Sequence, residues 1–428
     1  GFKIMDTKRI TTLMATTALV AMFTLPAAAQ DLSELKAQLE ALTQKVEQLE
    51  QAAAKAPVVT KAEPAMALAT SDGKFEMNLR GRIYADTAWI SDSDNTMDVK
   101  ATEFRTARLG IEGKAGTNVK YKLEADFAGN EVTMKDAYFE YHSKMGAFKF
   151  GQFKTANSLD EQTSSRHISV LEFASFTDAF DLARQLGIGY GLNSENYTFN
   201  TGIFVGSAGT DEENEGMTFA ARGTYGNTFE NGNYMLGASV RFRDNGDSGD
   251  FRYRQRPHSH LSTHRFIETP KLSEKDVFYA LEAAVSSGSL WGASEWAWNT
   301  AKIDAGDNYT FSGGYAEIGY FLTGEKRPLK LDKGAWDRPK VNSPLGEGGM
   351  GALALVARFD TIDLNDMDVM GGKQDTFILG ANWYMNRYSR IIVNYSHSKV
   401  TDEFYKMRNG ADGENSIDAL AVRFQVDW

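Results

Sequence analysis

The chain has 428 residues, with 46 lysines and arginines against 57 aspartates and glutamates, a net charge of −11 and no cysteine. This acidity argues against a general nucleic-acid binder, and the lack of cysteine excludes disulfide scaffolds, thiolate zinc sites and cysteine nucleophiles. One stretch, near the N-terminus, approaches the length of a membrane-spanning helix, so a helical membrane protein is excluded. A transmembrane β-barrel is not excluded, because its strands carry apolar residues only at alternate positions.

Residues 1–29 have the pattern of a secretory signal peptide. Lys8 and Arg9 precede an apolar run over residues 13–25, and the run is followed by Ala27-Ala28-Ala29. A basic start, an apolar core and a site with small residues predict cleavage after Ala29. A membrane anchor is the alternative, but the run is too short to span a bilayer. We therefore expect an exported protein.

The next segment, residues 30–56, carries a heptad pattern. Its apolar positions follow one another at intervals of three and four residues: Leu32, Leu35, Leu39, Leu42, Val46 and Leu49. Charged residues occupy the positions between them, which predicts a helix that joins other copies in a short coiled coil. An amphipathic helix packed on its own protein is the alternative. Pro57 and Pro64 bracket part of residues 57–73, which we interpret as a linker.

From residue 74 to the C-terminus, apolar residues recur with a period of two. In the first run Phe75, Met77 and Ile83 share one face, and Arg80 and Arg82 lie on the other. A soluble sandwich with water outside and a membrane barrel with water inside both fit one apolar and one charged face. The predicted export and the aromatic residues at the ends of runs, where membrane interfaces place them, favour the barrel.

About sixteen such runs can be counted, with roughly 22 residues for each strand and its connection, which suits spans of about ten residues. Their approximate centres are residues 82, 108, 124, 137, 150, 188, 202, 221, 238, 280, 296, 316, 356, 380, 394 and 422. We predict an all-β fold: a 16-stranded antiparallel transmembrane β-barrel over residues 74–428, preceded by a short periplasmic coiled-coil helix. A barrel of this size leaves a water-filled channel.

Three predicted connections are long, namely residues 154–184, 244–271 and 324–349. Long connections in a compact protein are usually functional or disordered. In a wide barrel we expect them to fold inward and narrow the pore.

Several motifs spread from about residue 75 to the C-terminus resemble the phosphate-selective porin O and P family. They are residues 103–113 (EFRTARLGIEG), 135–138 (KDAY), 151–154 (GQFK), 158–166 (SLDEQTSSR), 320–325 (YFLTGE) and 380–384 (GANWY). The resemblance implies a trimeric, 16-stranded outer-membrane porin whose luminal arginines lead to a phosphate-binding constriction, with residues 158–166 in the constriction loop. The chain departs from the family at Arg105-Thr106, where members often have paired arginines.

Phosphate transit needs fixed positive charge with forked donors in a confined pore. Arg252, Arg254 and Arg256 alternate along one segment, so in an extended conformation they point the same way. The candidate pore-lining or constriction residues for phosphate are Arg252, Arg254, Arg256, Arg166, Arg108, Arg105, Arg82, Arg80, Arg241 and Arg243. The alternative for the wall arginines is pairing with carboxylates of the same face, such as Glu124 and Asp136. That pairing would leave a general diffusion porin with weak selectivity.

No motif of an enzyme is present, so we expect neither catalysis nor a cofactor. His258, His260 and His264 have a spacing that could ligate a metal, but the adjacent arginines oppose a divalent ion, and we expect no metal site. A third hypothesis is a tether, in which the coiled coil binds the cell wall and the barrel only anchors it. The expected partners are two further copies in a homotrimer, outer-membrane lipid, small inorganic anions such as phosphate, and peptidoglycan through the coiled coil.

Overall fold

The computed structural model describes residues 32–55, 58–60, 66–207, 209, 214–304, 306–404, 406 and 413–428. The predicted signal peptide lies outside these residues. The chain divides into two compact units, residues 1–58 and 59–428. None of the described helices combines the length and the apolar character that crossing a membrane requires.

The first unit contains helix α2 (Leu32–Lys55). The predicted heptad positions Leu39, Leu42, Val46 and Leu49 are all exposed along this helix. An apolar stripe without a partner in the single chain is what a coiled-coil seam requires before association.

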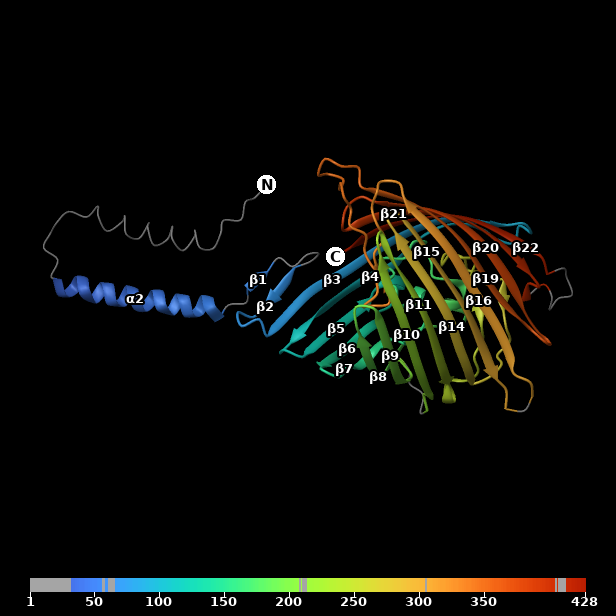
Figure 1. The fold of residues 1–428 in the computed structure, drawn as a ribbon, viewed down its shortest axis with the longest axis horizontal. Helices are drawn as coiled ribbons and strands as arrows, with labels where there is room; N and C mark the ends of the chain where they lie inside the picture. Colours follow the sequence, from blue (N-terminus) through green and yellow to red (C-terminus); the bar gives the residue numbers. More distant parts are fainter. Residues whose placement is uncertain are drawn as a thin grey trace. The chain divides into compact units, whose positions relative to one another are not determined.

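The second unit is built on sixteen long strands in the described part of the chain (Figure 1). They are β3 (Phe75–Asp92), β4 (Asp98–Ala115), β5 (Val119–Asp126), β6 (Thr133–Ser143), β7 (Gly146–Lys154), β8 (Arg184–Asn193), β9 (Tyr197–Val205), β10 (Met217–Phe229), β11 (Gly232–Asp244), β14 (Lys275–Ser287), β15 (Leu290–Lys302), β16 (Tyr309–Phe321), β19 (Ala352–Asp366), β20 (Val369–Tyr384), β21 (Ser389–Thr401) and β22 (Asn415–Asp427). Every predicted centre falls within one of them.

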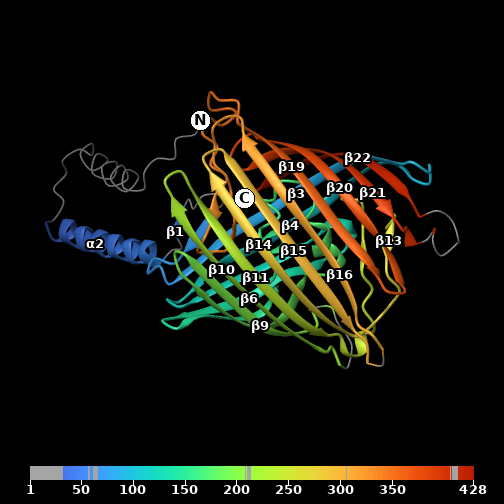
Figure 2. The same ribbon diagram turned by 45° about the vertical axis from the view of Figure 1, so that its right-hand side comes forward.

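Each long strand pairs antiparallel with the next, and the last pairs with the first. At this closure Asp427 lies opposite Arg82, and Ile417 lies opposite Asp92. The ring of strands is visible in Figures 1 and 2. Closure satisfies the backbone hydrogen bonds of both edges, which a sheet in lipid requires. The predicted 16-stranded antiparallel barrel is confirmed.

The two faces of the barrel wall are inverted relative to a soluble protein. On β3, Ile83 and Trp89 face outward with 42% and 46% of their surface exposed, whereas Arg82 faces inward and is 3% exposed. The same alternation of outward apolar and inward charged residues runs along β11, β14 and β22. An apolar outer surface of this kind matches lipid, as the period-two pattern predicted.

Shorter elements precede the first long strand or lie in the connections between the long strands. They are β1 (Val58–Thr60), β2 (Ala67–Ala69), η1 (Ala128–Asn130), α3 (Leu159–Gln162), α4 (Ser175–Ala179), η2 (Gly246–Ser248), β12 (Arg254–Gln255), β13 (Ile267–Glu268), β17 (Leu329–Lys330) and β18 (Ala335–Trp336). β2 falls in the predicted linker and pairs with β3, with Ala67 opposite Asn78. This pairing covers the part of β3 that β22 does not reach.

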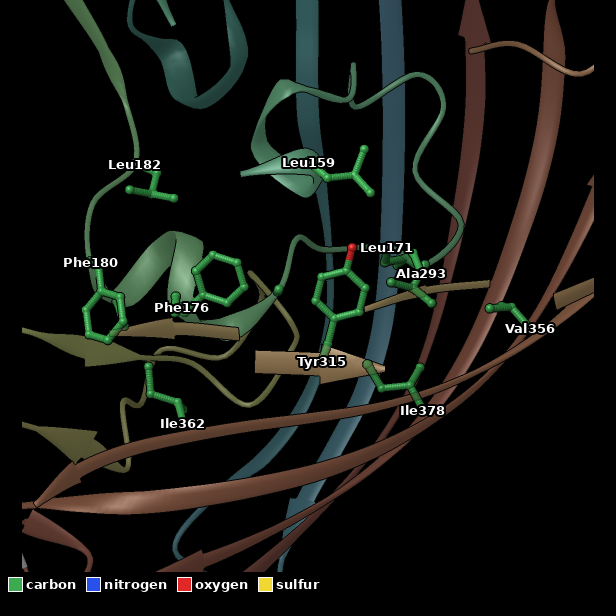
Figure 3. Close-up of a cluster of buried hydrophobic side chains, with 14 of the residues drawn as sticks. Leu159, Leu171, Phe176, Phe180, Leu182, Ala293, Tyr315, Val356, Ile362 and Ile378 are labelled. Carbon is green, nitrogen blue, oxygen red and sulfur yellow. The ribbon is translucent and has the colours of Figure 1, made fainter. Parts of the chain in front are cut away.

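The three long connections fold into the barrel, as expected. They span residues 155–183 with α3 and α4, 245–274 with β12 and β13, and 322–351 with β17 and β18. Their apolar side chains pack against the inner wall in one cluster (Figure 3). Phe176 of the first loop stacks on Phe278 of β14 at 6.4 Å between ring centroids. Phe180 meets Tyr253 of the second loop at 6.0 Å.

This core lies against one continuous part of the wall, which we call the packed side: the inner faces of β11, β14–β16 and β19–β22, together with Ala88 and Ile90 near the C-terminal end of β3. Inward alanines such as Ala280, Ala293 and Ala297 leave room there for the loops. Of the strands β4–β8, only the start of β4 meets that cluster in the described residues, through the partly buried Val99, and we call the wall from the first half of β3 to β8 the open side.

Candidate anion pathway on the open side

A cavity of about 970 Å³ lies between the open side and the loop of residues 155–183. The cations that line it are Arg80, Arg82, Arg105, Arg108, Lys122, Lys135, Lys149, Lys154, Arg184 and Arg423. The carboxylates that line it are Asp136, Glu161, Glu172 and Asp178. Positive charge is therefore concentrated here, although the chain as a whole carries a net charge of −11.

Strand alternation points most of these cations inward, but Arg105 needs a β-bulge. The register between β3 and β4 shifts so that Tyr84 faces Thr106 and Ala85 faces Phe104, which leaves Arg105 as the extra residue. Phe104 stays outward and Thr106 inward, while the side chain of Arg105 reaches the cavity. Bulges re-aim side chains in this way, and a regular strand would have directed Arg105 toward lipid.

A fully buried carboxylate, Glu124, organises the arginines of β3 and β4. It accepts hydrogen bonds from Arg80 at 3.0 Å, from Arg82 at 3.3 Å and from Arg108 at 3.3 Å. Arg108 also donates to Asp126 at 2.8 Å, and Arg82 donates to Ser165 of the inner loop at 2.8 Å. Arg80 also bonds to Glu112. Charge-assisted bonds of this kind fix guanidinium orientation, so the donors that face the cavity are preorganised.

A second carboxylate, Asp136 of β6, joins two further cations. Lys122 lies 2.5 Å from one of its oxygens, and the Nε of Arg184 donates to the other at 2.8 Å. Lys149 pairs with Glu140 at 2.9 Å. The wall therefore carries a sequence of anchored cations from β3 to β8.

The inner loop contributes negative charge opposite this wall. Glu172 accepts two hydrogen bonds from Arg105, at 3.0 and 3.1 Å, and one from Arg423 at 2.9 Å. Burial by itself would raise the pKa of Glu172, but Arg105 and then Arg423 outweigh it and lower the pKa to about 2. Asp178, in contrast, has a raised pKa, because burial outweighs the attraction of Arg265 and Arg256.

A smaller cavity of about 180 Å³ adjoins the first and shares Arg105, Glu172 and Asp178 with it. Arg256 and His260 of the second loop line it. Its lining therefore combines residues of the second inner loop with Arg105 of the cation-bearing wall β3–β8, which we call the cation wall.

Only one of the three alternating arginines of that loop lines either of the two cavities. Tyr253 and Gln255 are buried, and Arg252, Arg254 and Arg256 lie on the more exposed side of the segment. Arg256 lines the smaller cavity, whereas Arg252 and Arg254 line neither cavity and Arg252 pairs with Glu268 at 2.8 Å.

Three other candidate arginines also lie outside the larger cavity. Arg241 and Arg243 are buried on the packed side, where Arg243 donates to Asp276 at 2.6 Å and Arg241 donates to the carbonyl of Phe180 at 2.8 Å. Arg166 donates to the carbonyl of Gly81 at 3.4 Å. Burial, together with Arg82 and Arg80, lowers its pKa to about 9, so it keeps its charge at neutral pH.

Of the ten candidates, the larger cavity brings together Arg80, Arg82, Arg105 and Arg108. Sequence reasoning missed Lys122, Lys135, Lys149, Lys154 and Arg184. For Lys149, Lys154 and Arg184 the available signal was their place on β7 and β8, the two strands that flank the first long loop.

The three clustered histidines have separate neighbours. His258 contacts Ser175 at 2.9 Å and Asp360 at 3.2 Å, and His260 contacts Glu103 at 2.9 Å. His264 packs on Phe266. Within the described residues no group of three metal-ligating side chains occurs.

A closed 16-stranded barrel with an apolar outer surface and a charged inner wall defines a β-barrel porin. Residues 77–428 match the family described as phosphate-selective porin O and P. The chain belongs to this family and is an outer-membrane porin.

Two relatives cover most of the chain. A protein of Caulobacter vibrioides, described as uncharacterized, is 34% identical over 379 residues, which are 84% of this chain and 75% of that protein. Porin O of Pseudomonas aeruginosa is 26% identical over 419 residues, covering 86% of this chain and 93% of the relative.

Solved structures support the fold. The anion-selective porin from Comamonas acidovorans superposes with a TM-score of 0.52 at 12% identity, covering 82% of this chain and 99% of that porin. The outer membrane channel DcaP of Acinetobacter baumannii gives a TM-score of 0.51 at 12% identity, with 87% and 100% covered. At this identity the likeness concerns the barrel architecture.

Proposed function

We propose that the protein is a passive diffusion channel for small anions, with a preference for phosphate and without a catalysed reaction. The observation that carries the proposal is the lining of the larger cavity, in which ten cations face four carboxylates. Fixed cations in a narrow, low-dielectric channel raise the local concentration of anions and repel cations. Guanidinium groups also match the oxygens of phosphate in geometry.

Arg256 and Arg105 line the smaller cavity together with the carboxylates Glu161, Glu172, Asp178 and Asp181, and we propose that anions pass the two arginines before reaching the wall of β3–β8. Glu172 and Asp178 stand at the junction of the two cavities. Their negative charge limits how tightly an anion is held there, which favours release over trapping.

The reversal potential of the purified protein in a planar bilayer with a KCl gradient tests the proposal. We expect an anion-selective pore whose chloride current is blocked by millimolar phosphate. Changing Arg252, Arg254 and Arg256 together to alanine should weaken the block, and R256A should reproduce most of that effect. The matched control is R252A, since Arg252 pairs with Glu268 and lines neither cavity. A cation-preferring pore without phosphate block would overturn the proposal.

A general diffusion porin with weak selectivity is the second candidate. The pairing of most lining cations with carboxylates favours it, as the contacts of Glu124 and Asp136 illustrate. The reversal potential in a KCl gradient and the phosphate block also distinguish this candidate from the anion channel. A general diffusion porin predicts nearly equal permeability to potassium and chloride and no phosphate block.

We propose a homotrimer formed through the outer face of the short strands between β5 and β9. β5, β7, β8 and β9 have 8, 9, 10 and 9 residues, whereas β10, β11, β14 and β15 have 13 each. At about 3.3 Å per residue and a tilt of about 45°, eight residues rise only ~19 Å, less than the ~25 Å apolar band of a barrel. Other copies would cover this short wall in place of lipid.

Light scattering in mild detergent should give the mass of three chains. The substitution Phe139→Arg, at an outward position of β6 that is 51% exposed, should shift it toward one chain. A monomeric wild type would contradict the trimer.

We also propose export with cleavage after Ala29, and association of α2 with other copies or with peptidoglycan. N-terminal sequencing of the mature protein tests the cleavage. Deleting residues 31–56 should leave the conductance intact. Loss of all conductance would contradict the channel hypotheses, whereas loss of sedimentation with peptidoglycan alone would support the tether.

A further inference from the structure

Among the ten cations that line the larger cavity, Lys135 differs from the others. Nine of them form an ion pair with a carboxylate in the described residues. The ammonium of Lys135 forms neither an ion pair nor a hydrogen bond with the described part of the chain. Its three N–H donors are therefore available to a solute.

A second β-bulge explains why Lys135 reaches the cavity. Between β5 and β6, Glu124 faces Asp136 and Ala125 faces Met134, so Lys135 is the extra residue without a cross-strand partner. In a regular strand Lys135 and Asp136 would point to opposite faces, but here both line the cavity. The bulge thus supplies a cation next to Asp136 without using it to neutralise that carboxylate.

The neighbours of Lys135 add to its positive charge. Arg105, Arg108 and Arg184 line the same cavity as Lys135, and the carboxylate of Asp126, which also acts on Lys135, is bonded to Arg108. Arg184 donates its Nε to Asp136 and Arg108 donates Nε and Nη1 to carboxylates, which leaves both Nη groups of Arg184 and the Nη2 of Arg108 without a hydrogen bond in the described residues. Anchored guanidinium groups with spare donors around one unpaired ammonium match an anion that has several charged oxygens.

We infer that Lys135, with Arg184 and Arg108, forms the subsite at which a permeating oxyanion is held. At the other lining cations an anion competes with a resident carboxylate, whereas at Lys135 it displaces only water. The inference rests on the proposed anion channel and names the position within it that binds the solute. Phosphate and carboxylates share the required chemistry, since both present charged oxygens to N–H donors.

Chloride currents measured at increasing concentrations of inorganic phosphate, or of acetate, test this subsite. The informative variant is Lys135→Gln. The matched control is Lys149→Gln, which removes the same charge from the same cavity but from a lysine paired with Glu140. We expect K135Q to raise the half-blocking concentration about tenfold, as for the loss of one charged hydrogen bond, and K149Q to change it less than twofold. Lys135→Arg, which keeps the charge, should restore most of the block.

The outcomes separate the inference from the proposed function. If the wild type is anion-selective and blocked but K135Q matches it, or if K149Q weakens the block equally, the subsite is wrong and the anion channel stands. If the wild type shows neither selectivity nor block, both are wrong. Equal weakening for phosphate and acetate indicates a general oxyanion subsite, and weakening for phosphate alone indicates preference for a tetrahedral anion. Lys135→Ala serves as a second variant should K135Q insert poorly into the bilayer.

Discussion

The open side and the packed side of the lumen use the same residue types at the same inward positions, yet their charges have different roles. On the packed side Arg358 is 2% exposed, bonded to Glu317 at 2.8 Å and to Asp160 at 3.3 Å, and its guanidinium lies 4.2 Å from the centre of the Tyr315 ring. On the open side the side chain of Arg105 is 31% exposed and faces the cavity. An inward arginine is therefore available to a solute only where no loop covers it.

The inner loops create this difference. Ser158 to Asp160 are held on β15, where Glu295 accepts hydrogen bonds from the backbone N–H groups of Leu159 and Asp160 at 2.8 and 2.7 Å. Asn394 of β21 accepts the N–H of Leu171 at 2.7 Å. These anchors hold parts of the first loop on the packed side, whereas on the open side the loop touches Arg82 and Arg105 through Ser165 and Glu172 and a cavity remains between the loop and the cation wall.

The largest expected effect comes from breaking a buried charge cluster on the packed side. Arg358→Met removes the buried cation paired with Asp160 and leaves Glu317 with Arg327 alone, which should cost about 3–5 kcal/mol of unfolding free energy. Urea unfolding in detergent, followed by tryptophan fluorescence, measures it. The control is Arg80→Met on the open side, because Glu124 keeps Arg82 and Arg108. Equal losses would remove the distinction between the two sides.

An intermediate effect is expected from Glu172→Gln, which removes one of the four carboxylates of the larger cavity and frees Arg105. The preference for anions should rise about twofold. Since the pKa of Glu172 is lowered to about 2, its charge and the stabilisation by Arg105 persist above the ordinary value of 4.5 and are lost only as the pH falls toward 2.

Reversal potentials at pH 7 and pH 3 check both parts of this prediction. The difference between wild type and E172Q should persist at pH 3, because most of Glu172 is still ionised there. If the reversal potentials of the wild type and of E172Q are instead equal at pH 3, the carboxyl group of Glu172 has an ordinary pKa and its contacts with the arginines are weaker than described.

The smallest effect is expected from Arg252→Gln. The Arg252 side chain is 40% exposed and pairs with Glu268 outside both cavities. Exposed ion pairs contribute about 0–1 kcal/mol, so unfolding free energy and selectivity should both stay close to wild type. A clear loss of selectivity in the same bilayer assay would place Arg252 on the anion path and extend the open side into the second loop.

The period-two pattern predicted the sixteen strands and the direction of each regular side chain, because alternation is a local property of extended backbone. The predicted export and the aromatic residues at the ends of runs were needed to favour a membrane barrel over a soluble sandwich. It also located the three long connections. Arg80, Arg82 and Arg108 were predicted from this alternation, and the structure brings them to the cavity.

Only the tertiary structure decided which inward charges face open space. Strand alternation directs both Arg243 and Arg108 inward. Arg243 is buried against Asp276 whereas Arg108 lines the cavity, and this difference depends on where the inner loops pack. A regular alternation also could not place Arg105 and Lys135, because each is the extra residue of a bulge, where the inward and outward positions of the strand change phase. The overall charge of −11 is a sum over the whole chain, whereas the charge that a solute meets is set by the few side chains around the cavity.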